Sequence, residues 1–310
     1  MLLAGIAADL AAAAGQIPEL DGRYLALALA LQLATLAFRA LAWRNVLAAA
    51  YPREDVRLFS IGCAYAAGVA ANAFLPARGG EGVKIAMART QIPASSVATI
   101  AASLSVVLLL DAILGACLIV ALWATGVLPS LPALPSFLTS GFVSLALAVA
   151  AGLAVAIGLT VRRFAARLRR LLSSAARGLA ILRSPSVYLR TVLPFQLAAW
   201  TCRIGVVYFV LEAFRIEAGL ASAALLVVLN GAATAVPVPG GAGSQQVLAA
   251  YALQGVISVA AAVSFSLSMQ IGVTAVNTAV GLAAAMLLFR TLRPVAALRT
   301  AAGRSTTRKE

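Results

Sequence analysis

Long apolar runs divide the chain at regular intervals. A helix needs about 20 such residues to cross a hydrocarbon core of about 30 Å. Runs of this length or more occupy residues 24–43, 93–123, 137–161, 191–214 and 256–289. The pattern predicts an all-α polytopic membrane protein with about six to eight transmembrane helices.

Two apolar runs, at residues 58–75 and 220–236, are shorter and end in clusters of proline and glycine. Basic residues stand on both sides of the first run, so we expect it to enter and leave the membrane on the cytoplasmic side. The second run follows an outward-directed helix and enters from the other side. Each run with the short segment after it therefore predicts a re-entrant helical hairpin.

The two clusters share one spacing of proline and glycine. A shift of 161 positions superposes Pro76, Gly79, Gly80 and Gly82 on Pro237, Gly240, Gly241 and Gly243. The same shift maps short run on short run and long helix on long helix. Because the hairpins enter from opposite sides, we expect an inverted repeat, which is typical of transporters. An alternative is that the clusters are plain loops between spanning helices.

Composition narrows the class of protein. Hydrophobic residues make up 62% of the chain and charged residues 11%, which excludes a water-soluble enzyme. The net charge of +14 is concentrated between the apolar runs, as in the cytoplasmic loops of membrane proteins, and not in a nucleic-acid-binding surface. Histidine is absent, so sites built on imidazole are excluded, and we expect no metal and no cofactor.

The charge distribution predicts a single integral membrane domain, residues 1–310, in the cell (inner or plasma) membrane, with a cytoplasmic C-terminus. Its parts are a first half (about 22–125), a connecting helix (137–161), a cytoplasmic basic amphipathic linker (162–190), a second half (about 191–289) and a cytoplasmic tail (290–310). Residues 2–14 lack a basic start and contain Asp9, which is unlike a cleaved signal peptide. Whether they span the membrane is left open.

The two proline–glycine turns are the candidate binding site. Non-helical backbone inside a membrane is tolerated only where protein or a water-filled cavity covers it. Glycine allows backbone N–H groups to approach a ligand, and the helix start after each turn favours anions. The candidate substrate-binding residues are Asn72, Pro76, Arg78, Gly79, Gly80, Glu81 and Lys84 in the first turn, and Pro237, Pro239, Gly240, Gly241, Gly243, Gln245 and Gln246 in the second.

Charged residues of the first turn suggest a phosphate ligand. Arg78 and Lys84 are suited to phosphate oxygens, Arg78 through a bidentate fork and Lys84 as a point charge. Glu81 would hold one of these cations in place or exchange a proton. The alternative is a surface loop from which Arg78 and Lys84 reach lipid headgroups.

Two further charges, Asp111 and Arg203, lie midway along apolar helices. A charge at the bilayer centre costs about 2.5 to 3.5 kcal/mol on insertion scales. We therefore expect Asp111 and Arg203 to face the interior and to pair with each other. A structural pair and a role in ion coupling or substrate contact both remain open.

The motif Asn72-x-x-x-Pro76-x-Arg78-x-Gly80-Glu81-x-x-Lys84 resembles the signature of the lysylphosphatidylglycerol synthase transmembrane-region family, also called flippase-like. The second turn resembles the downstream element of that family, and the resemblance covers almost the whole chain. It implies lipid translocation, with Asn72, Arg78, Glu81 and Lys84 as functional positions. Because the chain ends at Glu310 without a soluble aminoacyltransferase domain, we expect a stand-alone membrane member and not an enzyme.

Three positions depart from the family pattern. Lys84 replaces an arginine, which keeps the charge but loses the fork. Gln246 stands where a glutamate is common, so a role that needs a second carboxylate is in doubt. Leu108 stands where an arginine commonly precedes Asp111, so Arg203 is the partner expected to replace it.

The expected function is a lipid flippase that moves a polar-headed, anionic or phosphate-containing lipid between leaflets through a cavity between the two halves. One alternative is an integral-membrane glycosyl or lipid-headgroup transferase, which needs a carboxylate base or a metal-binding pair at an aqueous face. Another is a non-transporting scaffold subunit. Membrane lipids are the expected partners, and a homo-oligomer and a lipid-synthesising enzyme partner are left open. The lipid, the direction of transport and the energy coupling do not follow from the sequence.

Overall fold

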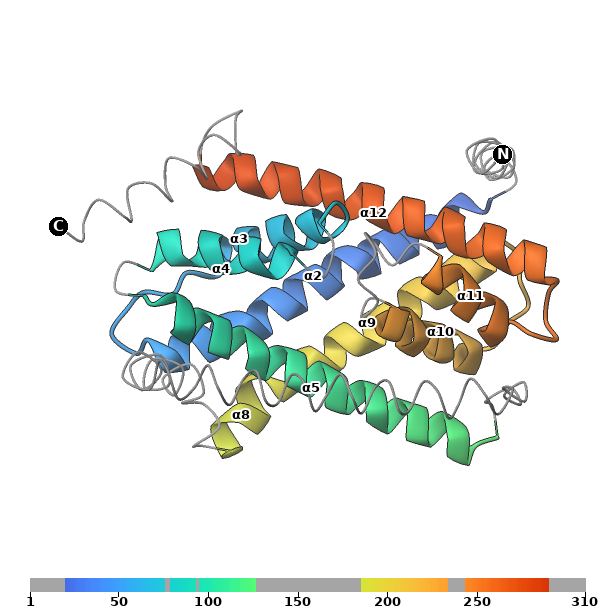
Figure 1. The fold of residues 1–310 in the computed structure, drawn as a ribbon, viewed down its shortest axis with the longest axis horizontal. Coiled ribbons are helices and arrows are strands. Elements are labelled where there is room, and N and C mark those ends of the chain that lie inside the picture. The colour runs from blue at the N-terminus through green and yellow to red at the C-terminus, as the bar shows by residue number, and fades with distance from the viewer. Residues whose placement is uncertain (1–19, 76–78, 93–94, 127–184, 234–242, 290–310) are drawn as a thin grey trace, which may run out of the picture.

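A computed structural model describes residues 20–75, 79–92, 95–126, 185–233 and 243–289. In these ranges every regular element is an α-helix (Figure 1). The helices are α2 (Gly22–Ala50), α3 (Leu58–Asn72), α4 (Gly80–Gln91), α5 (Val97–Ala124), α8 (Pro185–Thr191), α9 (Leu193–Ala213), α10 (Leu220–Ala233), α11 (Ser244–Ala252) and α12 (Val259–Phe289).

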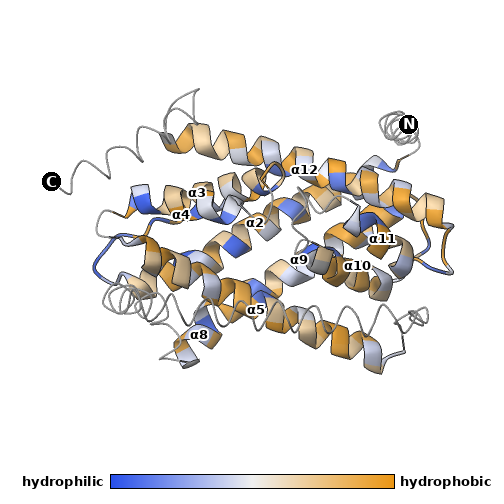
Figure 2. Ribbon diagram, in the orientation of Figure 1, coloured by the Kyte–Doolittle hydropathy of each residue, from blue (hydrophilic) through white to orange (hydrophobic). Residues whose placement is uncertain are grey.

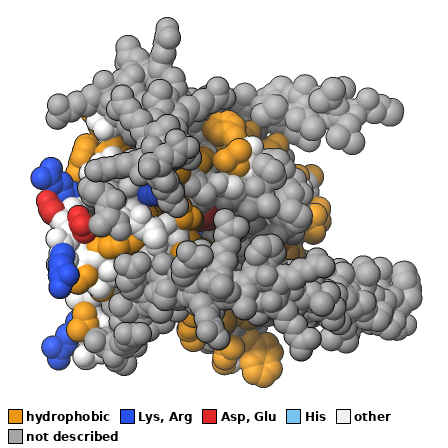
Figure 3. Space-filling model, turned by 60° about the vertical axis from the view of Figure 1, so that its left-hand side comes forward, with side chains coloured by type: hydrophobic (Ala, Val, Ile, Leu, Met, Phe, Trp, Pro, Cys, Tyr) orange, Lys and Arg blue, Asp and Glu red, His pale blue; other side chains and the backbone are white. Residues whose placement is uncertain are grey.

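Four of the described helices, α2, α5, α9 and α12, are long and apolar enough to cross a membrane. This confirms the prediction of an all-α polytopic membrane protein. Figure 2 shows that apolar residues cover most of α5 and α12. In Figure 3, charged side chains gather along one edge of the described surface. In the loop of residues 51–57, Arg53, Asp55 and Arg57 are exposed. The predicted connecting helix 137–161, residues 2–14 and the tail 290–310 lie outside the described residues.

Local polar contacts determine where the long helices begin. Asp21 precedes α2 and its Oδ1 accepts from the backbone N–H of Arg23 at 2.9 Å. Ser96 precedes α5 and its Oγ accepts from the N–H of Thr99 at 3.1 Å. Such capping satisfies donors that the helix itself leaves unpaired. The expected start of α5 at Pro93 was therefore too early, because Ser96 caps a helix that begins at Val97.

The first crossing is longer than its apolar run. The sequence predicted an end at residue 43, before the basic patch, whereas α2 continues to Ala50. Polar side chains in this last part bind backbone carbonyls of neighbouring segments. Arg44 Nε donates to Val56 O at 2.9 Å, and Asn45 Nδ2 donates to Thr191 O at 2.6 Å. Tertiary hydrogen bonds thus extend the helix into the polar region.

Short helices pair beside the long ones. The first pair is α3 with α4 and the second is α10 with α11. Figure 1 shows the two pairs at opposite ends of the molecule, with α2 and α9 side by side between them. The antiparallel packing of α2 against α9 is the most extensive helix contact in the described chain. The long helices α5 and α12 lie on opposite sides and run in opposite directions (Figure 1).

The order of helices follows the sequence repeat. The shift of 161 positions places Leu58, the start of α3, one position before the start of α10. It places Val97, the start of α5, one position before the start of α12. Each half contains a long helix, a short pair and a second long helix. Two buried apolar clusters form the core, one centred on Trp43, Ile61 and Ile100 of the first half and the other on Leu225 and Phe265 of the second, and each also takes in residues of the opposite half.

Candidate functional site

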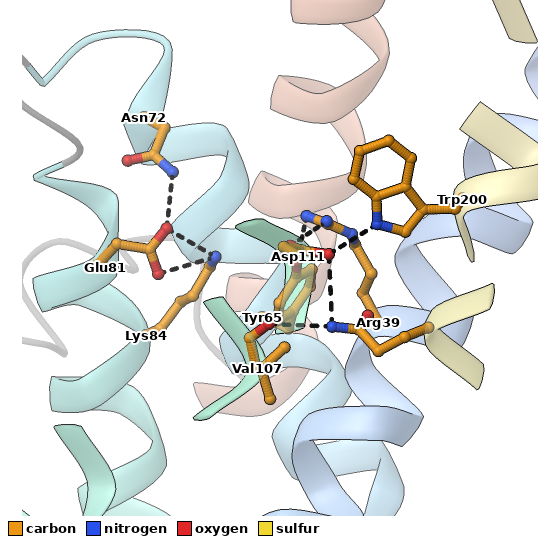
Figure 4. Close-up of polar contacts among 9 residues, drawn as sticks. Arg39, Tyr65, Asn72, Glu81, Lys84, Val107, Asp111 and Trp200 are labelled. Atoms are coloured by element: carbon orange, nitrogen blue, oxygen red, sulfur yellow. Dashed lines mark hydrogen bonds and ion pairs between the residues drawn. The ribbon is translucent and has the colours of Figure 1, made fainter. Parts of the chain in front are cut away.

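The first turn brings three of the predicted residues together (Figure 4). Asn72, at the end of α3, accepts from the backbone N–H of Gly80 at 2.8 Å through Oδ1. Its Nδ2 donates to Glu81 Oε1 at 3.5 Å. Lys84 Nζ lies 3.1 Å from both carboxylate oxygens of Glu81. Glu81 therefore holds a cation in place, which is one of the two roles that the sequence suggested for it.

Glycine in this turn serves helix packing. A Cβ on Gly80 would overlap the carbonyl oxygen of Gly68 and lie 2.6 Å from Asn72 Oδ1. The glycines thus let α3 and α4 approach closely. The sequence suggested that such N–H groups would face a ligand, but Asn72 already accepts from the N–H of Gly80. Gly79 precedes α4 as its N-cap residue, and Pro76 and Arg78 lie outside the described residues.

Lys84 is buried, with 3% of its surface exposed. Its Nζ lies 4.2 Å from the centroid of the Tyr65 ring, opposite the contact with Glu81. A buried ammonium requires such partners because its desolvation is costly. For Lys84 the structure therefore excludes the alternative of a surface side chain that reaches lipid headgroups.

The ion-pair partner of Asp111 is Arg39 of α2, so the predicted pair with Arg203 was wrong. The Arg39 and Asp111 side chains are 17% and 15% exposed. The Arg203 guanidinium lies 5.0 Å from the centroid of the Trp200 ring. Because α2 packs against both α5 and α9, Arg39 of α2 lies beside the Asp111 carboxylate of α5.

Asp111 is an acceptor for helix α9 as well. Trp200 Nε1 donates to its Oδ1 at 3.1 Å, and Gln196 Nε2 lies 3.4 Å from the same atom. Gln196 Nε2 also donates to Val107 O at 3.1 Å (Figure 4). One carboxylate thus binds groups from α2 and α9 to α5 at the centre of the molecule.

Sequence interpretation missed Arg39, Tyr65, Gln196 and Trp200. Arg39 lies within the apolar run 24–43, and a charge inside such a run was the available signal. Gln196 and Trp200 are four residues apart and so share one helix face. No pattern in the sequence indicated Tyr65.

The second turn is uncharged in its described part. Gly243, with φ of +84°, precedes α11, and its N–H donates to Gln246 Oε1 at 2.7 Å. Gln246 is buried, and its Nε2 donates to Gln270 Oε1 of α12 at 2.7 Å. In this second bond the NH2 group of Gln246 is the donor, a group that a glutamate at this position would lack. Gln245 beside it is partly exposed. Pro237, Pro239, Gly240 and Gly241 lie outside the described residues.

A cavity of about 780 Å³ opens where the start of α2 meets the connection between α9 and α10. Its charged lining residues are Asp21, Glu212, Arg215 and Glu217. The described lining is therefore more acidic than basic, and it contains none of the candidate substrate-binding residues. In the described chain, no group of three or more Cys, Asp or Glu side chains is placed to hold a metal ion.

A family model described as "Lysylphosphatidylglycerol synthase TM region" matches residues 1–296. No curated protein and no solved structure matches the chain. The family match agrees with the resemblance carried by the two turn motifs.

Proposed function

Because the chain belongs to the lysylphosphatidylglycerol synthase TM region family, we propose that it is a lipid flippase. It moves a polar-headed lipid that is anionic or contains phosphate from one leaflet to the other. The observation that carries the proposal is the buried Lys84–Glu81 pair beside the first turn. Such a pair is expensive within a membrane and is typical of a substrate path.

Helix lengths support re-entrant hairpins. The 15 residues of α3 reach about 22 Å, less than a hydrocarbon core of about 30 Å. Its partner α4 has 12 residues, and α10 and α11 have 14 and 9. Each pair would therefore turn inside the membrane. The opposite directions of α5 and α12 support an inverted arrangement of the two halves.

The pair also suggests how a headgroup would be handled. Phosphate and carboxylate both offer anionic oxygens to an ammonium group. A headgroup phosphate that enters the turn would replace the Glu81 carboxylate as the partner of Lys84. Lys84 thus remains paired throughout, and the displaced Glu81 carboxylate keeps the hydrogen bond from Asn72 Nδ2 and is 16% exposed to solvent.

Reconstitution into liposomes tests this function. Vesicles would contain fluorescently labelled phosphatidylglycerol or phosphatidylcholine, and quenching of the outer leaflet would measure exchange. We expect faster exchange of phosphatidylglycerol, a loss of about tenfold or more in Lys84→Met, and smaller loss in Lys84→Arg, which keeps the charge.

The same measurement can refute the proposal. Wild-type protein that accelerates neither lipid would exclude a flippase for these headgroups. Equal acceleration of both lipids, unchanged in Lys84→Met, would exclude recognition of the headgroup by Lys84. Arg53→Gln, on an exposed loop, is the matched control and should exchange lipid at the wild-type rate.

A further inference from the structure

Two largely buried ion pairs lie on either side of one aromatic residue. Lys84 and Glu81 form the first pair within α4, and Arg39 and Asp111 form the second between α2 and α5. Tyr65 of α3 lies between them (Figure 4). Its ring faces Lys84 Nζ at 4.2 Å from the centroid, and its hydroxyl accepts from Arg39 Nη1 at 3.3 Å.

The Tyr65 ring is fixed on further sides. Tyr65 is buried, and the Trp43 ring packs against it with a centroid separation of 6.2 Å and an angle of 57°. Trp43 Nε1 in turn donates to Ser103 Oγ of α5 at 3.1 Å. The ring therefore has one orientation, with its face toward Lys84 and its hydroxyl toward Arg39.

We propose that Tyr65 is the positioning residue that joins the two pairs and keeps Lys84 in place while its anionic partner changes. This inference rests on the proposed function, because the change of partner is the transfer of Lys84 from Glu81 to a headgroup. The aromatic face attracts the ammonium whichever anion is bound, and this attraction grows when water is excluded. Arg39 orients the ring through the hydroxyl, so the turn is linked to the centre of the molecule.

The two functions of Tyr65 can be separated by substitution. Tyr65→Phe keeps the aromatic face and removes the bond to Arg39. Tyr65→Leu removes both. If the ring positions Lys84, transport in Tyr65→Phe should stay close to that of wild type and transport in Tyr65→Leu should fall. Leucine also fills less space than phenylalanine, so a double-mutant cycle with Lys84 is what distinguishes the contact between the ammonium and the ring from loss of packing.

A double-mutant cycle tests the contact without reference to transport. Melting temperatures of the purified full chain would be measured for wild type, Tyr65→Leu, Lys84→Met and the double variant. We expect the double shift to differ from the sum of the single shifts by about 2 °C or more. If Lys84→Met does not fold, a variant that removes both charges replaces it in the cycle. This variant combines Lys84→Gln with Glu81→Gln.

The control cycle uses Tyr208→Leu, since Tyr208 lines the distant cavity at the end of α9. Its shift should add to that of Lys84→Met within about 1 °C. Additive shifts for Tyr65→Leu as well would overturn the proposal.

Transport provides the second measurement. In liposomes with labelled phosphatidylglycerol, Tyr65→Leu should lower the maximal rate about tenfold, with little change in the lipid concentration giving half-maximal rate. Tyr65→Phe should stay within about threefold of wild type. A wild-type rate in folded Tyr65→Leu would overturn the inference. If wild type is inactive, the flippase proposal alone fails, and the melting cycle still decides whether Tyr65 joins the two pairs.

Discussion

The charged side chains inside this protein have partners that their burial demands. Arg39 and Asp111 meet at the crossing of three helices, and Lys84 is held by Glu81 and by the Tyr65 ring. Taking an ion out of water costs several kcal/mol, which a well-placed opposite charge offsets. The loss of one partner should therefore lower the free energy of unfolding more inside the molecule than at its surface.

Asp111→Asn tests this at a single residue. The substitution removes the charge that balances Arg39 but keeps an oxygen for the Trp200 N–H. Breaking a buried pair in this way costs about 3 kcal/mol or more, so the free energy of unfolding should fall by that order. Thermal or denaturant unfolding in detergent would measure it.

Asp55→Asn is the matched control. Asp55 and Arg57 form an ion pair at 2.8 Å whose side chains are 72% and 76% exposed. Solvent screens such a pair, so its removal should leave stability unchanged within error. Equal losses in the two variants would contradict the idea that burial decides the contribution of a pair.

Helix packing in the first turn depends on glycine. Gly68 of α3 and Gly80 of α4 face each other so closely that neither position has room for a Cβ. This approach sets the distance between Asn72 on α3 and Glu81 on α4. The chemistry of the turn is thus a consequence of how two short helices pack.

Gly80→Ala should separate α3 from α4. The added Cβ meets backbone at Gly68, which cannot rotate away as a side chain would, so we expect a loss of about 1 to 3 kcal/mol in the free energy of unfolding. Lipid exchange should fall in parallel, because the Asn72–Gly80 bond is lost. Melting curves and the liposome assay would measure both effects.

Gly82→Ala, two positions along the same helix, should raise the free energy of unfolding, whereas Gly80→Ala lowers it. Nothing lies within 4 Å of a Cβ at Gly82. Alanine also forms helix more readily than glycine, by up to about 1 kcal/mol. Destabilisation by Gly82→Ala equal to that by Gly80→Ala would show that space at Gly80 is not the cause.

At the scale of the whole molecule, α2 and α9 lie side by side at the centre and the short pairs lie at opposite ends (Figure 1). From the positive-inside rule we expect the loop of residues 51–57 on the cytoplasmic side and the connection between α9 and α10 on the other side. This predicts that the two ends of the molecule face different sides of the membrane.

Cysteine labelling tests this orientation. In a background with Cys63, Cys117 and Cys202 replaced by alanine, Arg53→Cys and Glu217→Cys would each provide one exposed thiol. An impermeant maleimide should label Glu217→Cys in intact cells and Arg53→Cys only after permeabilisation. The reverse pattern would refute the predicted topology.

Much of the helix order was predictable because apolar length and glycine–proline breaks are local signals. The starts of α3 and α10, and the internal repeat that relates them, follow from counting residues. The sequence suggested that Glu81 holds either Arg78 or Lys84 in place, and the structure shows the contact with Lys84, three residues along the same helix.

Partners across helices were not predictable in the same way. An intramembrane charge shows that a counter-charge must exist, but its identity depends on which helices adjoin. The sequence by itself determined an apolar, helical, twofold-repeated chain and the need to neutralise Asp111 and Lys84. Only the tertiary structure decided that Arg39 neutralises Asp111 and that Tyr65 lies against Lys84, because the packing of α2 against α5 and the close pairing of α3 with α4 bring these side chains within reach.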